Sequence, residues 1–384
     1  MKKICFITTV PITLESFVIE TATNLYKNES YDITFICSPD PIFSNSLPEY
    51  IHFIPVKMAR GIDFSAFNSI SQFYKIFKKE KFDLVQYSTP NASCYASIAA
   101  FLSHVPIRLY AQWGIRYVGL KGISRKIFKS IEKLVCKLST HIRAVSPKNM
   151  QFGIDEKLYK PQKVSVIGNG GTIGVDMGDY NIQNRDVWRL NIREKYQLAK
   201  EDFVFGFAGR ISIDKGCNEL LKAFKNISKN SKNAKLLIIG PNEQSGINQE
   251  LLDWAHVSNS VIFTGPIEKQ NMKMYYSALD VLVHPTYREG FGMVIQEAGA
   301  LAVPTITTDI PGASEVMENN VSCLLVPPKN AHELKNAMLS LLNNKEKVST
   351  LGQAAYDRTR SLYARPIMLE FQRQEYKKLL YGET

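Results

Sequence analysis

The sequence predicts an α/β protein of two domains, each built on a doubly wound parallel sheet. Short apolar runs, several of them uninterrupted, alternate along the whole chain with stretches of helical composition. This alternation is typical of parallel strands that are buried on both faces by helices. At 384 residues the chain is also longer than one hydrophobic core usually supports. We therefore expect two domains of about 190 residues each.

The first half of the chain supplies the elements of an N-terminal domain, expected over residues 1–168. The expected strands are residues 3–8, 32–37, 52–56, 83–87, 107–111, 141–144 and 164–167. The expected helices include residues 14–27, 64–79, 92–102 and 122–138. Closely spaced glycines follow, and they predict an interdomain linker over residues 169–191.

The second half repeats the pattern over residues 192–365, and a final helical segment follows over residues 366–384. The expected strands are residues 203–207, 235–239, 261–263, 281–284, 305–307 and 323–326. Helices are expected between these strands, and helices over 334–342 and 368–380 close the chain.

Composition excludes several classes of protein. The chain is 45% apolar and 22% charged, which is typical of a globular protein, and no run of 18 apolar residues is present to span a membrane. The apolar start of the chain stops at Val10-Pro11 without a cleavage site, so we interpret it as a first strand. The six cysteines are dispersed without metal-ligand spacing, which favours reduced thiols in a cytoplasmic protein.

The positive charge is concentrated in the first half. Residues 1–168 contain 22 Lys and Arg against 12 Asp and Glu, whereas the remainder contains 25 against 24. No nucleic-acid-binding motif accompanies this excess, so it favours an anionic membrane surface or a lipid-diphosphate acceptor over DNA or RNA. Residues 121–137 contain six Lys and Arg residues but only one acidic residue, Glu132. This helix can pack its apolar side on the sheet, lie against a membrane with its basic side, or do both.

A first candidate site lies between His284 and Ala300. A buried strand is expected before Glu289, Gly290-Phe291-Gly292 forms a turn, and a helix carries Glu297. Such a turn lies at the carboxyl end of a strand, where open α/β sheets bind ligands, and its glycines let a backbone approach an anion. The alternative is an ordinary turn with two solvated carboxylates.

A second strand-to-helix turn carries two cations. Arg210 follows the apolar strand at 203–207 and Lys215 precedes the next helix. Two cations at a helix N-terminus form a suitable site for a diphosphate, with surface salt bridges as the alternative.

Together these two segments resemble a known family. The patterns G-R-x-x-x-x-K-G (Gly209 to Gly216) and E-G-F-G-x-x-x-x-E (Glu289 to Glu297) are similar to those of the retaining GT-B glycosyltransferases, specifically family 4. The resemblance covers residues 206–327 well and the first half in outline. It implies two Rossmann-like domains facing a central cleft, with the final helix returning to the first domain.

The resemblance also implies an activity like that of bacterial capsule and O-antigen transferases. A hexose or N-acetylhexosamine would pass with retention from a nucleotide sugar, with a UDP-sugar as the expected donor, to a lipid-linked or polysaccharide acceptor. The enzyme would work in the cytoplasm, at the inner face of the plasma membrane. Two alternatives stay open: a sugar-nucleotide epimerase on the same fold, and a catalytically silent partner that docks a transferase on the membrane.

Residue roles follow from the same resemblance. Arg210 and Lys215 would neutralise the diphosphate, Glu289 would hold the donor sugar and Glu297 would accept from the ribose hydroxyls. The remaining expected donor-binding residues are Gly209, Pro241, Ile267, Gly290, Phe291 and Gly292. Because the sequence contains no Asp-x-Asp, no metal and no other cofactor are expected.

The sequence departs from the family after the fifth strand. Many relatives have His-Gly there, whereas this chain has Trp113-Gly114. Trp113 and Arg116 are candidate acceptor-binding residues, and a core position for Trp113 is the alternative.

Overall fold

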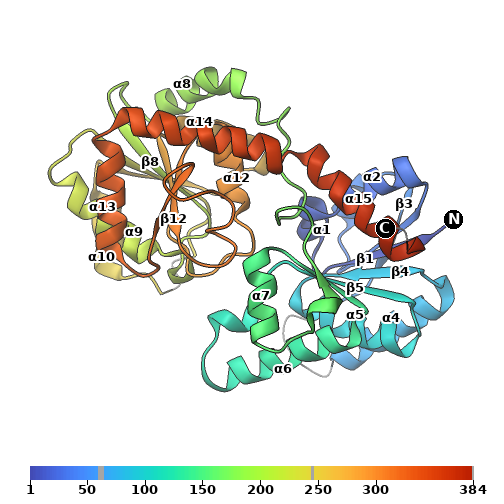
Figure 1. The fold of residues 1–384 in the computed structure, drawn as a ribbon. Coiled ribbons are helices and arrows are strands. Elements are labelled where there is room, and N and C mark those ends of the chain that lie inside the picture. The colour runs from blue at the N-terminus through green and yellow to red at the C-terminus, as the bar shows by residue number, and fades with distance from the viewer. Residues whose placement is uncertain (59–64, 244–245, 383–384) are drawn as a thin grey trace. The chain divides into compact units, whose positions relative to one another are not determined.

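The computed structural model describes residues 1–58, 65–243 and 246–382. The chain forms two compact units (Figure 1). Unit 1 comprises Met1–Ile173 and Pro366–Thr384, and unit 2 comprises Gly174–Arg365. The chain thus passes from one unit to the other within the segment for which a linker was predicted, 169–191, and the first helix of unit 2 begins inside that segment.

Unit 1 is built on a parallel sheet with the strand order β3-β2-β1-β4-β5-β6-β7. Helices cover both faces of this sheet (Figure 1). Its strands are β1 (Lys3–Ile7), β2 (Asp32–Cys37), β3 (Ile51–Pro55), β4 (Leu84–Tyr87), β5 (Ile107–Gln112), β6 (His141–Ala144) and β7 (Val164–Ser165). Its helices are α1 (Pro11–Phe17), α2 (Ile19–Glu29), α3 (Pro41–Ser46), α4 (Ser65–Glu80), α5 (Pro90–Leu102), α6 (Gly122–Leu138), α7 (Pro147–Asp155) and α15 (Arg365–Tyr381).

Unit 2 is built on a second parallel sheet with the order β10-β9-β8-β11-β12-β13. Its strands are β8 (Phe203–Ala208), β9 (Ala234–Ile239), β10 (Val261–Gly265), β11 (Val281–His284), β12 (Thr305–Thr308) and β13 (Cys323–Val326). Its helices are α8 (Arg185–Lys195), α9 (Cys217–Ser228), α10 (Gln249–Val257), α11 (Met272–Ala278), α12 (Met293–Gly299), α13 (Ala331–Leu342) and α14 (Lys345–Leu362).

The sequence of β8 explains why both faces of the second sheet are covered. Phe203, Phe205 and Phe207 belong to one hydrophobic cluster, with α9 and α13, whereas Val204 and Ala208 belong to another. Successive side chains of a strand point to opposite faces, so an uninterrupted apolar strand has to be buried on both. The predicted fold class, two Rossmann-like α/β domains, is confirmed.

The expected helix over residues 14–27 is wrong in one respect, because the structure divides it into α1 and α2. Val18 leaves the helical region, with φ −125° and ψ −38°, while its N–H still binds Leu14 O. Leu14, Val18, Ala22 and Leu25 all join one buried cluster. Their helical spacing continues across the break, so the sequence pattern could not reveal it.

Two other elements differ slightly from expectation, and a third agrees with it. The strand expected over 164–167 is limited to β7, which has two residues. The helix expected over 64–79 corresponds to α4, although Phe64 lies outside the described residues. The helix expected over 122–138 has the same bounds as α6.

The strand orders locate the ligand-binding edge of each sheet. In unit 2, β8 lies between β9 and β11, so the chain leaves neighbouring strands β8 and β11 toward opposite sides. This is a topological switch point, outside which open α/β sheets bind ligands. Both predicted motifs follow these two strands directly.

No helix among the described residues is long and apolar enough to cross a membrane.

Candidate active site

A lysine, a glutamate and a histidine meet at the switch point of unit 2. Lys215 Nζ lies 2.9 Å from Glu289 Oε2. His284 Nε2 lies 2.9 Å from the same carboxylate oxygen. The other oxygen, Oε1, accepts from the N–H of Gly290 at 3.1 Å. Lys215 and Glu289, which are 74 positions apart, are therefore brought together by the fold.

Packing between the two turns fixes this arrangement. Gly216 has φ +72°, and a Cβ atom there would lie 1.9 Å from Pro285 O, so only glycine fits. The Tyr287 N–H also donates to Asp214 O at 2.8 Å. The turn that follows β8 is thus held directly against the turn that follows β11.

The charges of this cluster follow from its surroundings. Burial by itself raises the pKa of the Glu289 carboxyl, but the charge of Lys215 and the hydrogen bond from His284 outweigh it and hold that pKa well below its ordinary value. Burial lowers the pKa of His284, although its hydrogen bond to Glu289 acts in the opposite direction. At neutral pH the cluster therefore contains a carboxylate, an ammonium group and a neutral imidazole.

Arg210 lies at the same edge of the sheet but has different partners. Its guanidinium is 2.8 Å from Glu243 and 3.3 Å from Asp214. The side chain is 46% exposed, so these pairs are weak and screened by solvent. A ligand anion can compete with them.

Glu297 lies on α12 and is held by tyrosines. Tyr276 Oη donates to Glu297 Oε2 at 2.9 Å, and Tyr180 bonds the same carboxylate. Burial raises the pKa of Glu297 in spite of these hydrogen bonds. Because α12 begins at Met293, Glu289 lies in the turn before the helix. The two glutamates have no hydrogen-bond partner in common: Glu289 is bound by Lys215, His284 and Gly290, and Glu297 is bound by the two tyrosines.

The glycine turn between the two glutamates has one buried side chain. Phe291 packs edge to face on Tyr363 with ring centroids 5.5 Å apart, and Gln296 donates to its carbonyl. Its expected contribution to donor binding is thus restricted to the backbone. Gly290 and Gly292 flank it, and Gly292 directly precedes α12.

The other expected donor-binding residues lie on neighbouring loops. Pro241 accepts from Ile211 N at 3.1 Å. Gly240, with φ +134°, approaches Gly209 so closely that a Cβ atom would lie 2.2 Å from its carbonyl oxygen. Ile267, after β10, packs partly against the cluster that contains Tyr275 and Tyr276.

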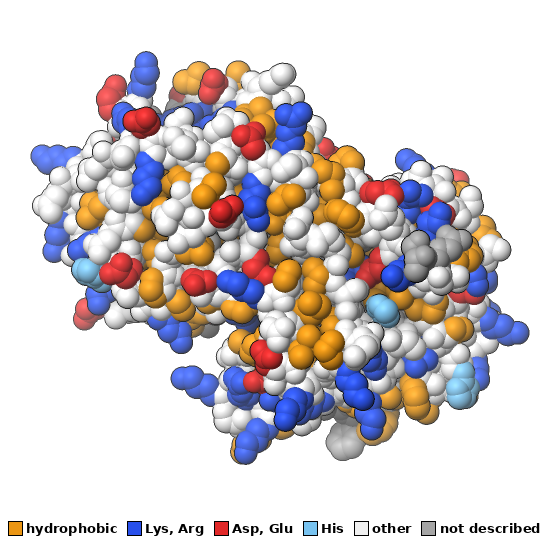
Figure 2. All heavy atoms as spheres, viewed as in Figure 1, with side chains coloured by type: hydrophobic (Ala, Val, Ile, Leu, Met, Phe, Trp, Pro, Cys, Tyr) orange, Lys and Arg blue, Asp and Glu red, His pale blue; other side chains and the backbone are white. Residues whose placement is uncertain are grey.

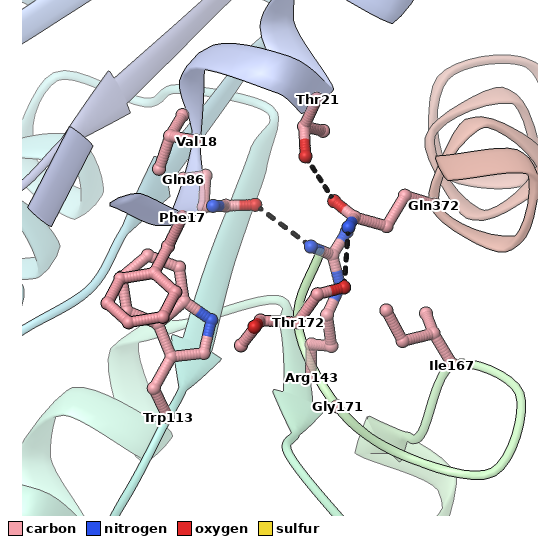
Figure 3. A pocket seen from close by; sticks show the side chains of 10 residues that line it. All are labelled: Phe17, Val18, Thr21, Gln86, Trp113, Arg143, Ile167, Gly171, Thr172 and Gln372. Atoms are coloured by element: carbon pink, nitrogen blue, oxygen red, sulfur yellow. Dashed lines mark hydrogen bonds between the residues drawn. The ribbon is translucent and has the colours of Figure 1, made fainter. Parts of the chain in front are cut away.

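Trp113 lies in unit 1, after β5, and is half-buried. Its ring packs on Phe17 with centroids 5.4 Å apart, and it borders a small cavity with Gln86, Arg143 and Gln372 (Figure 3). The cavity volume of about 10 Å³ suits a single water and excludes a sugar. An acceptor could therefore reach only the exposed part of the indole.

Arg116 is exposed, and its guanidinium lies over the ring of Phe128 on α6, 4.3 Å from the ring centroid. The two candidate acceptor residues, Trp113 and Arg116, thus follow the same strand but pack on different helices.

The exposed face of α6 combines cations with apolar side chains. Lys126, Lys133 and Lys137 are exposed, as are Ile123, Ile127 and Leu134, of which Ile123 is 77% exposed. The one acid of the helix, Glu132, is buried and accepts from Tyr110 and Gln112. Figure 2 shows Lys and Arg side chains gathered over this part of the surface.

The structure shows how α6 packs, which the sequence left open. The helix buries Glu132, Val135 and Cys136. On the apolar side that could have packed on the sheet, Ile123, Ile127 and Leu134 are exposed, and Ile131 packs against the core. Lys129 pairs with Glu156 rather than pointing away from the protein.

Sequence reasoning missed three residues of the candidate site: His284, Tyr276 and Tyr180. His284 has one local signal, its position at the end of a strand five residues before Glu289. The two tyrosines have no local sequence signal, because both are far from Glu297 in the sequence and only the folded chain brings them close to it.

Two Rossmann-like units on all-parallel sheets of this topology give the chain the GT-B fold. Comparison with known families agrees. Residues 189–358 match the model of glycosyl transferases group 1, and residues 3–146 match the model described as glycosyl transferase 4-like. The chain belongs to the group 1 family of glycosyltransferases.

Two relatives cover most of the chain. A capsular polysaccharide biosynthesis glycosyltransferase of Staphylococcus aureus, CapM, is 31% identical over 350 residues, covering 90% of this chain and 89% of CapM. An Escherichia coli UDP-Gal:α-D-GlcNAc-diphosphoundecaprenol α-1,3-galactosyltransferase is 25% identical over 329 residues, covering 84% of this chain and 82% of that enzyme.

The fold is shared with a solved structure, that of Anabaena HepE in complex with UDP and glucose. The TM-score is 0.77 at 18% identity, with 99% of this chain and 100% of HepE covered.

Proposed function

We propose that the enzyme transfers a hexose or N-acetylhexosamine, with retention, from a UDP-sugar to a lipid-linked or polysaccharide acceptor in surface glycan biosynthesis. The observation that carries this proposal is the paired Lys215 and Glu289 at the switch point of unit 2. The S. aureus relative is a capsular polysaccharide enzyme, and the E. coli relative uses UDP-Gal and a diphospholipid-linked sugar. The E. coli relative supports a UDP-sugar donor and a lipid-linked acceptor, and the S. aureus relative supports a surface-glycan product.

Breaking the bond between sugar and nucleotide leaves a diphosphate, on which negative charge grows in the transition state. Lys215 supplies a fixed positive charge next to the proposed sugar site. Arg210 supplies a second charge when it exchanges Glu243 and Asp214 for the diphosphate. Preorganised charges of this kind stabilise the departing group without a metal ion.

The two glutamates would have separate tasks. Glu289 is ionised and held by three hydrogen-bond donors, which suits a residue that fixes the position of the donor sugar near the anomeric carbon. Glu297 has tyrosine partners, which suits an acceptor for ribose hydroxyls.

The basic face of α6 would bind an anionic membrane from the cytoplasmic side. It carries exposed lysines and exposed apolar side chains, while Glu132 is buried. Such a face attracts anionic lipid and inserts its apolar side chains at the interface. A lipid-linked acceptor is presented at the same surface, near Arg116.

Metal-independent donor cleavage tests the proposed function. Purified protein incubated with a panel of UDP- and GDP-sugars and a bacterial membrane extract should release UDP from a UDP-sugar, with equal rates in the presence and absence of EDTA. The released UDP is measured by a coupled assay. Loss of activity with EDTA and its return with Mn²⁺ would contradict the metal-free chemistry, and release of GDP alone would contradict the UDP donor.

Membrane binding should depend on the exposed lysines of α6. We expect the triple variant Lys126→Glu, Lys133→Glu, Lys137→Glu to bind phosphatidylglycerol vesicles at least about 10-fold more weakly than wild type, because each lysine near an anionic surface contributes on the order of 1 kcal/mol. Co-sedimentation at low and high salt measures this.

The matched control changes three exposed lysines of unit 2, Lys222, Lys229 and Lys232, to glutamate. It carries the same change in net charge and should bind vesicles almost normally. Equal losses in both variants would show that net charge alone, and not α6, determines binding.

A further inference from the structure

Strand β11 ends in a buried histidine that none of the expected roles uses. The His284 side chain is 2% exposed. Its backbone carbonyl accepts from Thr307 Oγ1 on β12 at 2.9 Å, so the residue is fixed to the sheet. Its ring nitrogen Nε2 lies 2.9 Å from Glu289 Oε2.

The hydrogen bonds of the ring determine its tautomer. A carboxylate can only accept, so the nitrogen that faces Glu289, Nε2, has to carry the proton. The other nitrogen, Nδ1, is buried without a hydrogen-bond partner among the described residues. A proton on Nδ1 would be a buried unsatisfied donor, which is costly. The ring is therefore a neutral Nε2–H donor aimed at one atom.

We propose that His284 is a positioning residue that holds the Glu289 carboxylate in its working orientation. This role rests on the proposed function, in which Glu289 contacts the donor sugar. His284 itself would not touch the substrate.

Glu289 Oε2 needs His284 as a second hydrogen-bond donor because its first donor, Lys215, has another task in the proposed reaction. In the proposed reaction Lys215 also faces the departing diphosphate, and as negative charge grows there its ammonium group is drawn toward it. Without His284, Oε2 would be held by Lys215 alone and would move with it, while the Gly290 N–H holds only Oε1. His284 cannot follow, because it belongs to β11 and is bound to β12, so Glu289 stays in place.

Two variants separate the hydrogen bond from simple packing. His284→Gln places an amide N–H near the position of Nε2 and cannot titrate. His284→Phe fills the same buried space without any donor. If His284 only filled space, the phenylalanine variant would be at least as active as the glutamine variant.

We expect His284→Phe to lower kcat for donor cleavage by about 10- to 100-fold, the usual effect of losing a hydrogen bond to a charged group. Its donor KM should stay within about threefold, because the ground-state contacts to UDP are unchanged. His284→Gln should recover most of kcat. UDP binding by calorimetry and thermal melting confirm that both variants are folded.

A spectroscopic measurement tests the hydrogen bond without any assay of turnover. Long-range ¹H–¹⁵N NMR of histidine-labelled wild type should show, for the signal that is absent in His284→Gln, a proton on Nε2 and none on Nδ1 at neutral pH. The exposed His104 provides the reference for a solvated ring.

Specific results would overturn the inference. A proton on Nδ1, or His284→Phe as active as His284→Gln, removes the positioning role while leaving the proposed function intact. A wild type that folds and binds UDP but cleaves no donor would instead overturn the proposed function, and with it the role of His284.

Discussion

Replacing Lys215 by alanine should lower kcat by about 10²- to 10³-fold, equivalent to about 3–4 kcal/mol of transition-state stabilisation. The expected loss is large because the Lys215 ammonium group is partly buried and is held 2.9 Å from Glu289, so solvent screens it little. The variant also leaves the Glu289 carboxylate without its cation. Steady-state rates of UDP release measure the effect, and thermal melting shows whether the variant stays folded.

Two other cations provide the comparison. Arg210→Ala should also lower kcat, by about 10²-fold, because its proposed contact with the diphosphate forms as the bond breaks. Lys222 is exposed on the neighbouring helix α9, and Lys222→Ala should be as active as wild type. An unchanged kcat in Lys215→Ala would remove the cation from the proposed mechanism.

Glu289→Gln should lower kcat by about 10²-fold or more, with little change in donor KM. The carboxylate accepts from Lys215 and His284 at Oε2 and from Gly290 N at Oε1. A glutamine amide has one accepting oxygen, so its NH₂ group has to face one of these donors. The side chain would turn away from the donor sugar and also lose the negative charge.

Glu297→Gln should behave differently, because a ribose looks much the same in the ground and transition states. Its carbonyl oxygen can still accept from Tyr276, so we expect mainly a higher donor KM, by about 10-fold, with a smaller change in kcat. Glu250→Gln, on the exposed face of α10, is a control for the change in charge. Initial rates across donor concentrations measure kcat and donor KM for both variants. A lower kcat in Glu297→Gln together with a higher KM in Glu289→Gln would show that the two glutamates have been assigned the wrong tasks.

The sequence predicted the fold well because the apolar periodicity of the elements is local. Uninterrupted runs such as Phe203–Ala208 have to be buried on both faces, which requires a parallel sheet covered by helices. The two motif turns were also predictable, because glycines and charged residues directly after such runs mark the ligand-binding edge. The break at Val18 was not, because the helical spacing of buried residues continues across it.

The contacts inside the site could not be read from the sequence. Arg210 and Glu243 are 33 positions apart, and Tyr276 reaches Glu297 across 21 positions. Both pairs depend on how loops from neighbouring strands pack. The sequence also could not show which apolar residues of α6 are exposed. Ile123 and Val135 are equally suited to a core, and only the packing of the helix on the rest of unit 1 distinguishes them.

Stereochemistry tests the central claim, retaining transfer from a UDP-sugar, most directly. Time-resolved ¹H NMR of purified protein with the preferred UDP-α-sugar, in the absence of an acceptor, should show slow hydrolysis to UDP with the α-anomer of the free sugar appearing first and the β-anomer growing in later by mutarotation. Glu289→Gln should abolish this signal. Initial formation of the β-anomer, or conversion of the nucleotide sugar to its epimer without release of UDP, would contradict the proposed function.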